Sequence, residues 1–276
     1  MTPTQSSQSK SKAQRRAEAQ RRAAEKRAAE LRRKRTQFGI RAGIALAVVV
    51  AIIVVVVVVT GGSSSPPASF SNPHLGSSLQ PIPASMSSTW VQPPAQTPGP
   101  EGIGIPSGPK LATLANTASG STLNGIECQT NEQVTVHVHT HLTVYVNGQA
   151  RVIPYGIGIP GFQAEQTSAG PYVGTGNCFY WLHAHANDGI IHIESPSTTQ
   201  MFTLGQFFDE WGIPLSSTQV GPATGKVTVF FTSPGHKTGI YTGDPRNLPL
   251  GNHYEIQLNV GTPIVAPYKV TNWNNL

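Results

Sequence analysis

The chain has 276 residues, a formal net charge of +6, 12% charged residues and two cysteines. Residues 1–41 hold 13 of the 19 Lys and Arg and 3 of the 13 Asp and Glu, a local balance of 13 − 3 = +10. The other residues therefore carry 6 − 10 = −4. Because the basicity belongs to a short tail, the bulk of the chain is not a basic nucleic-acid-binding protein. Two cysteines are also too few for a disulfide-dense scaffold.

Residues 42–60 predict one transmembrane helix. Residues 42–59 contain no charged side chain, and nine of these 18 residues are Val. At about 1.5 Å per residue they span roughly 27 Å, close to the hydrocarbon thickness of a bilayer. A cleaved signal peptide is the main alternative. The long basic region before the run and the lack of an Ala-x-Ala site after it favour an uncleaved signal-anchor.

The basic tail, residues 1–41, is expected in the cytoplasm, since the Lys and Arg excess lies before the apolar run. It offers no apolar face to bury, so its expected partners are anionic lipid headgroups of the bilayer. Nucleic acid is a lesser alternative for the tail. Everything after residue 60 is expected outside the cell membrane.

Residues 61–110 are expected to be a disordered tether between the membrane and a folded domain. They contain 11 of the 23 prolines, interspersed with serine and glycine. A segment of this composition has little apolar surface with which to offset its conformational entropy. Residues 111–276 then form one extracytoplasmic domain of ordinary size.

Strands dominate the predicted domain. Residues 134–146 alternate between apolar and polar side chains, which predicts a strand with one buried face. Asn147-Gly148 follows as a hairpin turn, and residues 149–154 return. A second hairpin is expected from strands at 179–185 and 190–194, and residues 226–232 and 254–260 are expected to be further strands.

One short helix is predicted at 204–211. Thr203 and Gln206 have the spacing of a capping box, while Gly212 and Pro214 end the helix. The fold class is therefore α+β and β-rich, with hairpins and one helix after a transmembrane segment. An all-β sandwich or barrel is the alternative.

Six of the nine histidines lie between positions 137 and 192. His137, His139 and His141 alternate along one strand, and His183 and His185 along another. Residues at i and i+2 of a strand share a face and stand about 7 Å apart, close enough to bind one ion.

The second hairpin tests whether His192 joins them. A two-residue turn at 188–189 places His185 opposite His192 and His183 opposite Glu194. Three imidazoles and one carboxylate then share one face of the hairpin.

A turn at 187–188 instead pairs His183 with His192 and leaves both on that face. A three-residue loop would send His192 to the other face. If both hairpins belong to one sheet, all six histidines can meet on its face away from the core.

Nitrogen ligands with one carboxylate suit Zn or Cu(II). The proposed ligands are His137, His139, His141, His183, His185, His192 and Glu194. The alternatives are that the histidines merely decorate a solvent-facing sheet, or that they sense pH.

Cys128 and Cys178 precede the two histidine-bearing strands. Outside the membrane a disulfide is expected, which would close a loop of about 50 residues. A thiolate metal ligand is the alternative.

The stretches HVHTHLTVYVNG, CFYWLHAHANDGIIHIESP and FTLGQFFDEWGIPLS resemble an uncharacterised family of membrane-anchored or secreted bacterial and archaeal proteins. That resemblance covers residues 126–260 and implies no activity. Residues 179–260 also resemble the β-grasp folds of ubiquitin-like sulfur carriers. The chain ends in NWNNL rather than a reactive Gly-Gly, so the carrier chemistry does not transfer.

The leading functional hypothesis is a single-pass, membrane-anchored, extracytoplasmic domain that binds Zn or Cu through its histidines. A small metal-dependent hydrolase or hydratase is the second hypothesis, since three histidines around zinc with an open position form a catalytic arrangement. The third is a non-enzymatic module that binds the cell wall or another envelope partner.

Overall fold

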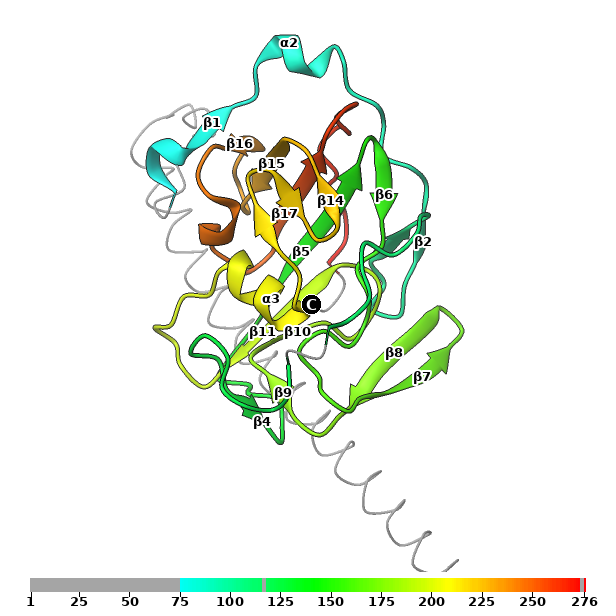
Figure 1. Ribbon diagram of the computed structural model, residues 1–276, viewed down its shortest axis with the longest axis vertical. Helices are drawn as coiled ribbons and strands as arrows, with labels where there is room; N and C mark the ends of the chain where they lie inside the picture. The colour runs from blue at the N-terminus through cyan, green and yellow to red at the C-terminus, as the bar shows by residue number, and fades with distance from the viewer. Residues whose placement is uncertain (1–74, 116–117, 274–275) are drawn as a thin grey trace, which may run out of the picture. The chain divides into compact units, whose positions relative to one another are not determined.

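The structure is a computed structural model that describes residues 75–115, 118–273 and 276 (Figure 1). The expected basic tail, the transmembrane segment and residues 61–74 of the expected tether lie outside the described residues. Among the residues that are described, no helix has both the length and the apolar character needed to cross a membrane.

An eight-stranded sheet organises the domain. Its strands follow the order β1 (Leu79–Pro81), β16 (Gly239–Tyr241), β15 (Val227–Thr232), β17 (Tyr254–Val260), β5 (Val136–Val146), β11 (Ile190–Ser195) and β10 (Leu182–His183), with β6 (Gln149–Arg151) paired to β5. Among the described strands of this sheet, only β17 and β5 pair in parallel, and Figure 1 shows these two long strands at the centre of the described domain.

The helix α3 (Leu204–Trp211) covers the apolar face of this sheet. It begins with a capping box of Thr203 and Gln206 and ends at Gly212 in a left-handed conformation. Phe207, Phe208 and Trp211 are fully buried in the same cluster as the apolar side chains of β5. The predicted helix bounds are confirmed, because capping residues act locally.

The β-rich α+β class is also confirmed. The all-β alternative is wrong, since α3 packs on one face and the described sheet stays open, with β1 and β10 at its edges. β5 lies between β11 and β17. The β-grasp resemblance would require residues 179–260 to form one continuous sheet by themselves. They do not, because β5, which precedes them in the sequence, separates β11 from β17.

The described part of the expected tether is folded, which corrects that prediction for residues 75–110. This segment contains the short helices η1 (Gly76–Ser78) and α2 (Ala84–Ser87), the strand β1, and the hairpin β2 (Gln96–Pro98) with β3 (Gly104–Pro106). Leu79 and Ile103 are buried. Proline restricts the unfolded chain, so a few buried apolar residues offset its smaller loss of entropy.

The polar face of the sheet is covered rather than solvated. Residues 262–273 cross it, and the side chains of Glu255, Gln257 and Asn259 on β17 hold them by hydrogen bonds to the backbone. Trp90 lies edge-on against Phe230 of β15. On the histidine face of β5, His139 and His141 are buried, whereas His137, near the start of the strand, is exposed.

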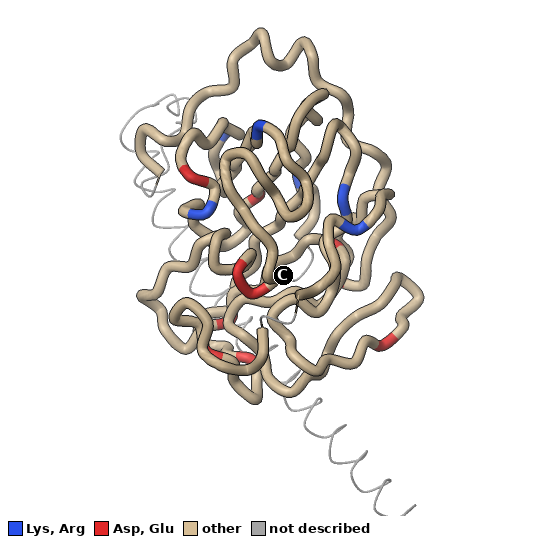
Figure 2. The backbone as a smooth tube through the Cα atoms, in the orientation of Figure 1, with Lys and Arg blue, Asp and Glu red and all other residues tan. Residues whose placement is uncertain are grey.

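Smaller hairpins complete the domain. They are β4 (Cys128–Gln129) with β9 (Phe179–Tyr180), β7 (Gln163–Thr167) with β8 (Gly170–Thr175), and the three-stranded β12 (Leu215–Ser216), β13 (Gln219–Val220) and β14 (Ala223–Thr224). The short helix η2 (Pro245–Asn247) precedes β17. Figure 2 shows how few charged positions the described chain carries.

Candidate metal centre

Three histidines lie in one row across three neighbouring strands. His183 of β10 pairs with His192 of β11, and His192 pairs with His139 of β5. This is the register expected from a turn at 187–188, although residues 184–189 form a loop rather than a tight turn. Neighbouring strands lie about 4.8 Å apart, so the three rings are neighbours on one face. The rings of His183 and His192 are stacked, and that of His139 meets His192 edge-on.

A second row lies two residues away. Glu194 of β11 pairs with His137 of β5, and the backbone N–H of Glu194 donates to the carbonyl of Trp181. The Oε1 atom of Glu194 lies 3.1 Å from Nε2 of His137 and 3.5 Å from Nδ1 of His192. The carboxylate thus stands between the two rows.

His183 and His185 are held in a tautomer that exposes Nε2. Nδ1–H of His183 donates to the Tyr180 carbonyl over 2.8 Å, and Nδ1–H of His185 donates to the Val173 carbonyl of β8. The two Nε2 atoms face each other at 3.1 Å. In the neutral form neither Nε2 carries a hydrogen, so two lone pairs meet.

Glu101 orients His192. It lies at the tip of the β2–β3 hairpin, and its carboxylate accepts a hydrogen bond from Nε2–H of His192 over 2.7 Å. Nδ1 of His192 then faces Nε2 of His139 at 3.1 Å. A carboxylate that holds the outer nitrogen of a histidine is the usual support of a metal-binding imidazole.

His141 does not join the cluster. It pairs with Ile190 at the far end of β11, and its Nε2 contacts the carbonyl of Asp188 at 3.0 Å. Its ring packs against Tyr268 and Trp273 of the C-terminal segment. Sharing a face with His139 is insufficient, because each step of two residues moves a side chain about 7 Å along the strand.

The protonation states favour metal binding. Burial, followed by the neighbouring imidazoles, holds the pKa of His183 well below its ordinary value and lowers the pKa of His139 to about 3. Burial and His192 lower the pKa of His185 to about 4. These imidazoles are neutral near pH 7, which is the form that binds metal.

His192 differs from its neighbours. Burial by itself would lower its pKa, but the contacts with Glu101 and Glu194 raise the pKa of His192 to about 10. Burial and the charge of Glu101 raise the pKa of Asp188 well above its ordinary value. In the absence of a cation, the proton on His192 thus compensates the carboxylates around it.

Sequence reasoning missed Glu101 and Glu132. The Oε1 atom of Glu132 lies 3.5 Å from Nε2 of His185. Glu101 lies in the segment for which the composition predicts a disordered tether, so the sequence predicts no contact from it. One signal was present: Glu101 is the only charged residue between positions 61 and 109.

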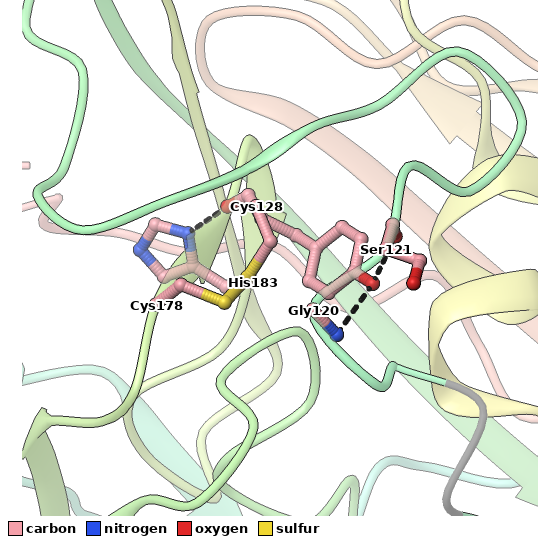
Figure 3. Close-up of a disulfide and its surroundings, with 6 residues drawn as sticks. Gly120, Ser121, Cys128, Cys178 and His183 are labelled. Carbon is pink, nitrogen blue, oxygen red and sulfur yellow. Dashed lines mark hydrogen bonds between the residues drawn. A yellow bond between two sulfur atoms is a disulfide. The ribbon is translucent and has the colours of Figure 1, made fainter.

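The disulfide between Cys128 and Cys178 is present, as expected, and it excludes a thiolate ligand. Cys128 pairs with Tyr180 across β4 and β9. The hydroxyl of Tyr180 donates to the carbonyl of Ser121 and accepts from the N–H of Gly120. Figure 3 shows Gly120, Ser121 and His183 around the disulfide. The bridge therefore braces the backbone that accepts the His183 hydrogen bond.

Two overlapping groups of side chains could hold a metal ion. His183, His185, His192 and Glu194 are all buried, and their ligand atoms lie within 4.8 Å of one another. His137, His139 and His192 form the other group. Between residues 111 and 225, Arg151 is the sole Lys or Arg, so little positive charge opposes a cation here.

Comparison with known proteins finds no matching family model, curated protein or solved structure.

Proposed function

We propose that this protein binds a transition-metal ion, Zn or Cu(II), through His183, His185, His192 and Glu194. The observation that carries the proposal is the contact between the Nε2 atoms of His183 and His185. Both rings donate their Nδ1–H to backbone carbonyls, so both Nε2 lone pairs point at each other over 3.1 Å. A cation between them turns this repulsion into attraction.

The distance between the two Nε2 atoms supports a first-row transition-metal ion. Zinc binds histidine nitrogen at about 2.0–2.1 Å, so two nitrogens in a tetrahedral zinc site lie about 3.3 Å apart. His183 and His185 match this separation. His192 and the carboxylate of Glu194, which lie 3.5 Å apart, complete a set of four.

The donor types narrow the metal. Three imidazoles and one carboxylate suit Zn or Cu(II), whereas Cu(I) prefers sulfur ligands. Both cysteines form the disulfide, and the side chain of Met201 is exposed rather than directed into the cluster. The ligands therefore favour a divalent ion.

We also propose that this domain stands outside the cell membrane on a single-pass anchor at residues 42–60. The support is the uncharged apolar run after a tail of +10. A disulfide is in keeping with an oxidising compartment outside the cytoplasm. The resemblance to membrane-anchored bacterial and archaeal proteins points to the same placement.

Metal analysis of the full-length chain tests the proposed centre. We expect the purified protein to retain Zn or Cu(II), or to bind it after chelator treatment, whereas His183→Gln with His185→Gln should bind substantially less metal than the wild type. His236→Gln, which changes a histidine outside the cluster, is the matched control. Saturation at 100 times Kd should also stabilise the wild type by about 2.7 kcal/mol.

Two results would overturn the proposal. One is a wild-type protein that takes up neither metal at any concentration. The other is a double variant that melts cooperatively, and is therefore folded, yet binds as much metal as the wild type.

A further inference from the structure

The cluster contains more ligands than one tetrahedral ion uses. Five imidazoles and Glu194 divide into two groups that overlap only at His192, and Glu132 stands 3.5 Å from His185. A structural zinc ion takes four ligands and a catalytic one takes three with a water. At least two potential ligands are therefore surplus to a single ion.

The contacts separate these ligands into two sets. His183 and His185 face each other at 3.1 Å through their Nε2 atoms. His139 and His192 face each other at the same distance, through Nε2 and Nδ1. The first pair comes from β10 and the loop that follows it, and the second pair comes from β5 and β11. Each pair has the separation of two ligands on one ion.

Glu194 reaches both sets. Its Oε1 atom lies 3.1 Å from Nε2 of His137 and 3.9 Å from Nε2 of His183. Its Oε2 atom is buried and has no hydrogen-bond partner within the described part of the chain. A carboxylate in this position can give one oxygen to each of two ions.

We propose that the cluster holds two metal ions, bridged by the carboxylate of Glu194. One ion takes His183 and His185, with Glu132 near enough to complete its ligands, and the other takes His137, His139 and His192. This inference rests on the proposed metal-binding function and refines its ligand set, since His192, which belongs to both groups of potential ligands, is assigned here to the second ion. Two-metal sites place their ions about 3.5–4 Å apart, which one bridging carboxylate can span.

The surrounding charge suits two cations. Glu101, Glu132 and Asp188 contact the histidines of the cluster or one another, and Glu194 lies at its centre. Four carboxyl groups thus surround the ligands.

Each subsite has one partly exposed side chain. The side chains of His183 and Glu194 are 0% and 2% exposed, whereas those of His137 and Glu132 are 32% and 38% exposed. Glu132 lies beside His185, and His137 belongs to the other subsite, so solvent reaches the edge of both.

Titration of the full-length, chelator-treated chain with Zn(II) tests the inference. We expect two ions per chain by calorimetry and by elemental analysis of the dialysed protein. His137→Asn with His139→Asn should lower the count from two to one, and the ion that it keeps shows that the variant is folded. His236→Asn should leave the count at two.

Cu(II) gives an independent reading. A first Cu(II) equivalent should give an electron paramagnetic resonance signal, and the second should weaken it because two bridged Cu(II) ions couple magnetically. A wild-type count of one, or a signal that simply doubles, would overturn the two-ion inference and leave the proposed function standing. A count of zero would overturn both.

Discussion

Glu101 determines which nitrogen of His192 faces the other ligands. Its carboxylate holds Nε2–H, so Nδ1 turns toward His139 and Glu194. The tip of the β2–β3 hairpin delivers this carboxylate, where Gly102 adopts a positive φ and Gly99 bonds Ile103 across the turn. One residue far from the strands in sequence thus orients a ligand.

Removal of that carboxylate should weaken metal binding without abolishing it. We expect Glu101→Ala to raise the Kd for Zn(II) by about 10–100-fold, the usual effect of losing the group that supports a metal-bound histidine. The Kd of Glu101→Gln should lie between those of Glu101→Ala and the wild type, because the glutamine amide oxygen still accepts the hydrogen bond. Calorimetric titration measures both.

Glu127→Ala, which removes an exposed glutamate, is the control and should leave the Kd unchanged. Equal Kd values for Glu101→Ala and the wild type would show that Glu101 has no part in orienting His192.

At the scale of elements, strand β17 shows how much the alternation of apolar and polar side chains predicts about a strand. Its apolar positions Ile256 and Leu258 are buried in the core, as the pattern predicts. Its polar positions Glu255, Gln257 and Asn259 are also buried, because they bond the backbone of residues 262–273. A period of two identifies two faces of a strand but not what covers the second face.

Glu255 gives this element a pH-dependent contribution to stability. Burial raises the pKa of Glu255 from its ordinary 4.5 to about 7, although the N–H of Val270 donates to it. Between pH 4.5 and about 7, the Glu255 carboxyl is therefore protonated in the folded state and ionised in the unfolded state. The contribution is complete below pH 4.5 and is lost as the pH rises through about 7.

We therefore expect Glu255→Gln to flatten the decline in unfolding free energy between pH 4.5 and 7.5. Urea unfolding at each pH measures the unfolding free energy, and a chelator in the buffer removes any contribution from bound metal. Glu127→Gln serves as the control. Parallel profiles for Glu255→Gln and the wild type would contradict the assigned role.

At the scale of the whole molecule, the +6 charge separates into a basic tail and an acidic domain. The tail of +10 sets the expected orientation in the membrane, and the domain of −4 contains the candidate metal centre. We expect the full-length chain to sediment with membranes after an alkaline wash and a chain starting at residue 61 to stay soluble. A full-length chain released by the wash would contradict the proposed anchor.

Local features of the sequence determined much of this protein. The capping box fixed α3 because its donors and acceptors lie within one turn. Asn147 and Gly148 fixed the first hairpin, since both adopt the positive φ that this turn needs. Alternation placed His137 and His139 on one face of their strand and His183 and His185 on one face of theirs, whereas the face of His192 depended on the length of the turn before it.

Only the tertiary structure decided which of those groups meet. It placed β5 between β11 and β17. It left His141 opposite Ile190, outside the row of His183, His192 and His139. It also brought Glu101 from a proline-rich segment into contact with His192. These contacts join residues about 50–115 positions apart, and no local pattern encodes them, because the covering of a sheet face depends on how distant segments pack. The sequence determined the kind of ligands, and the fold determined their number and arrangement.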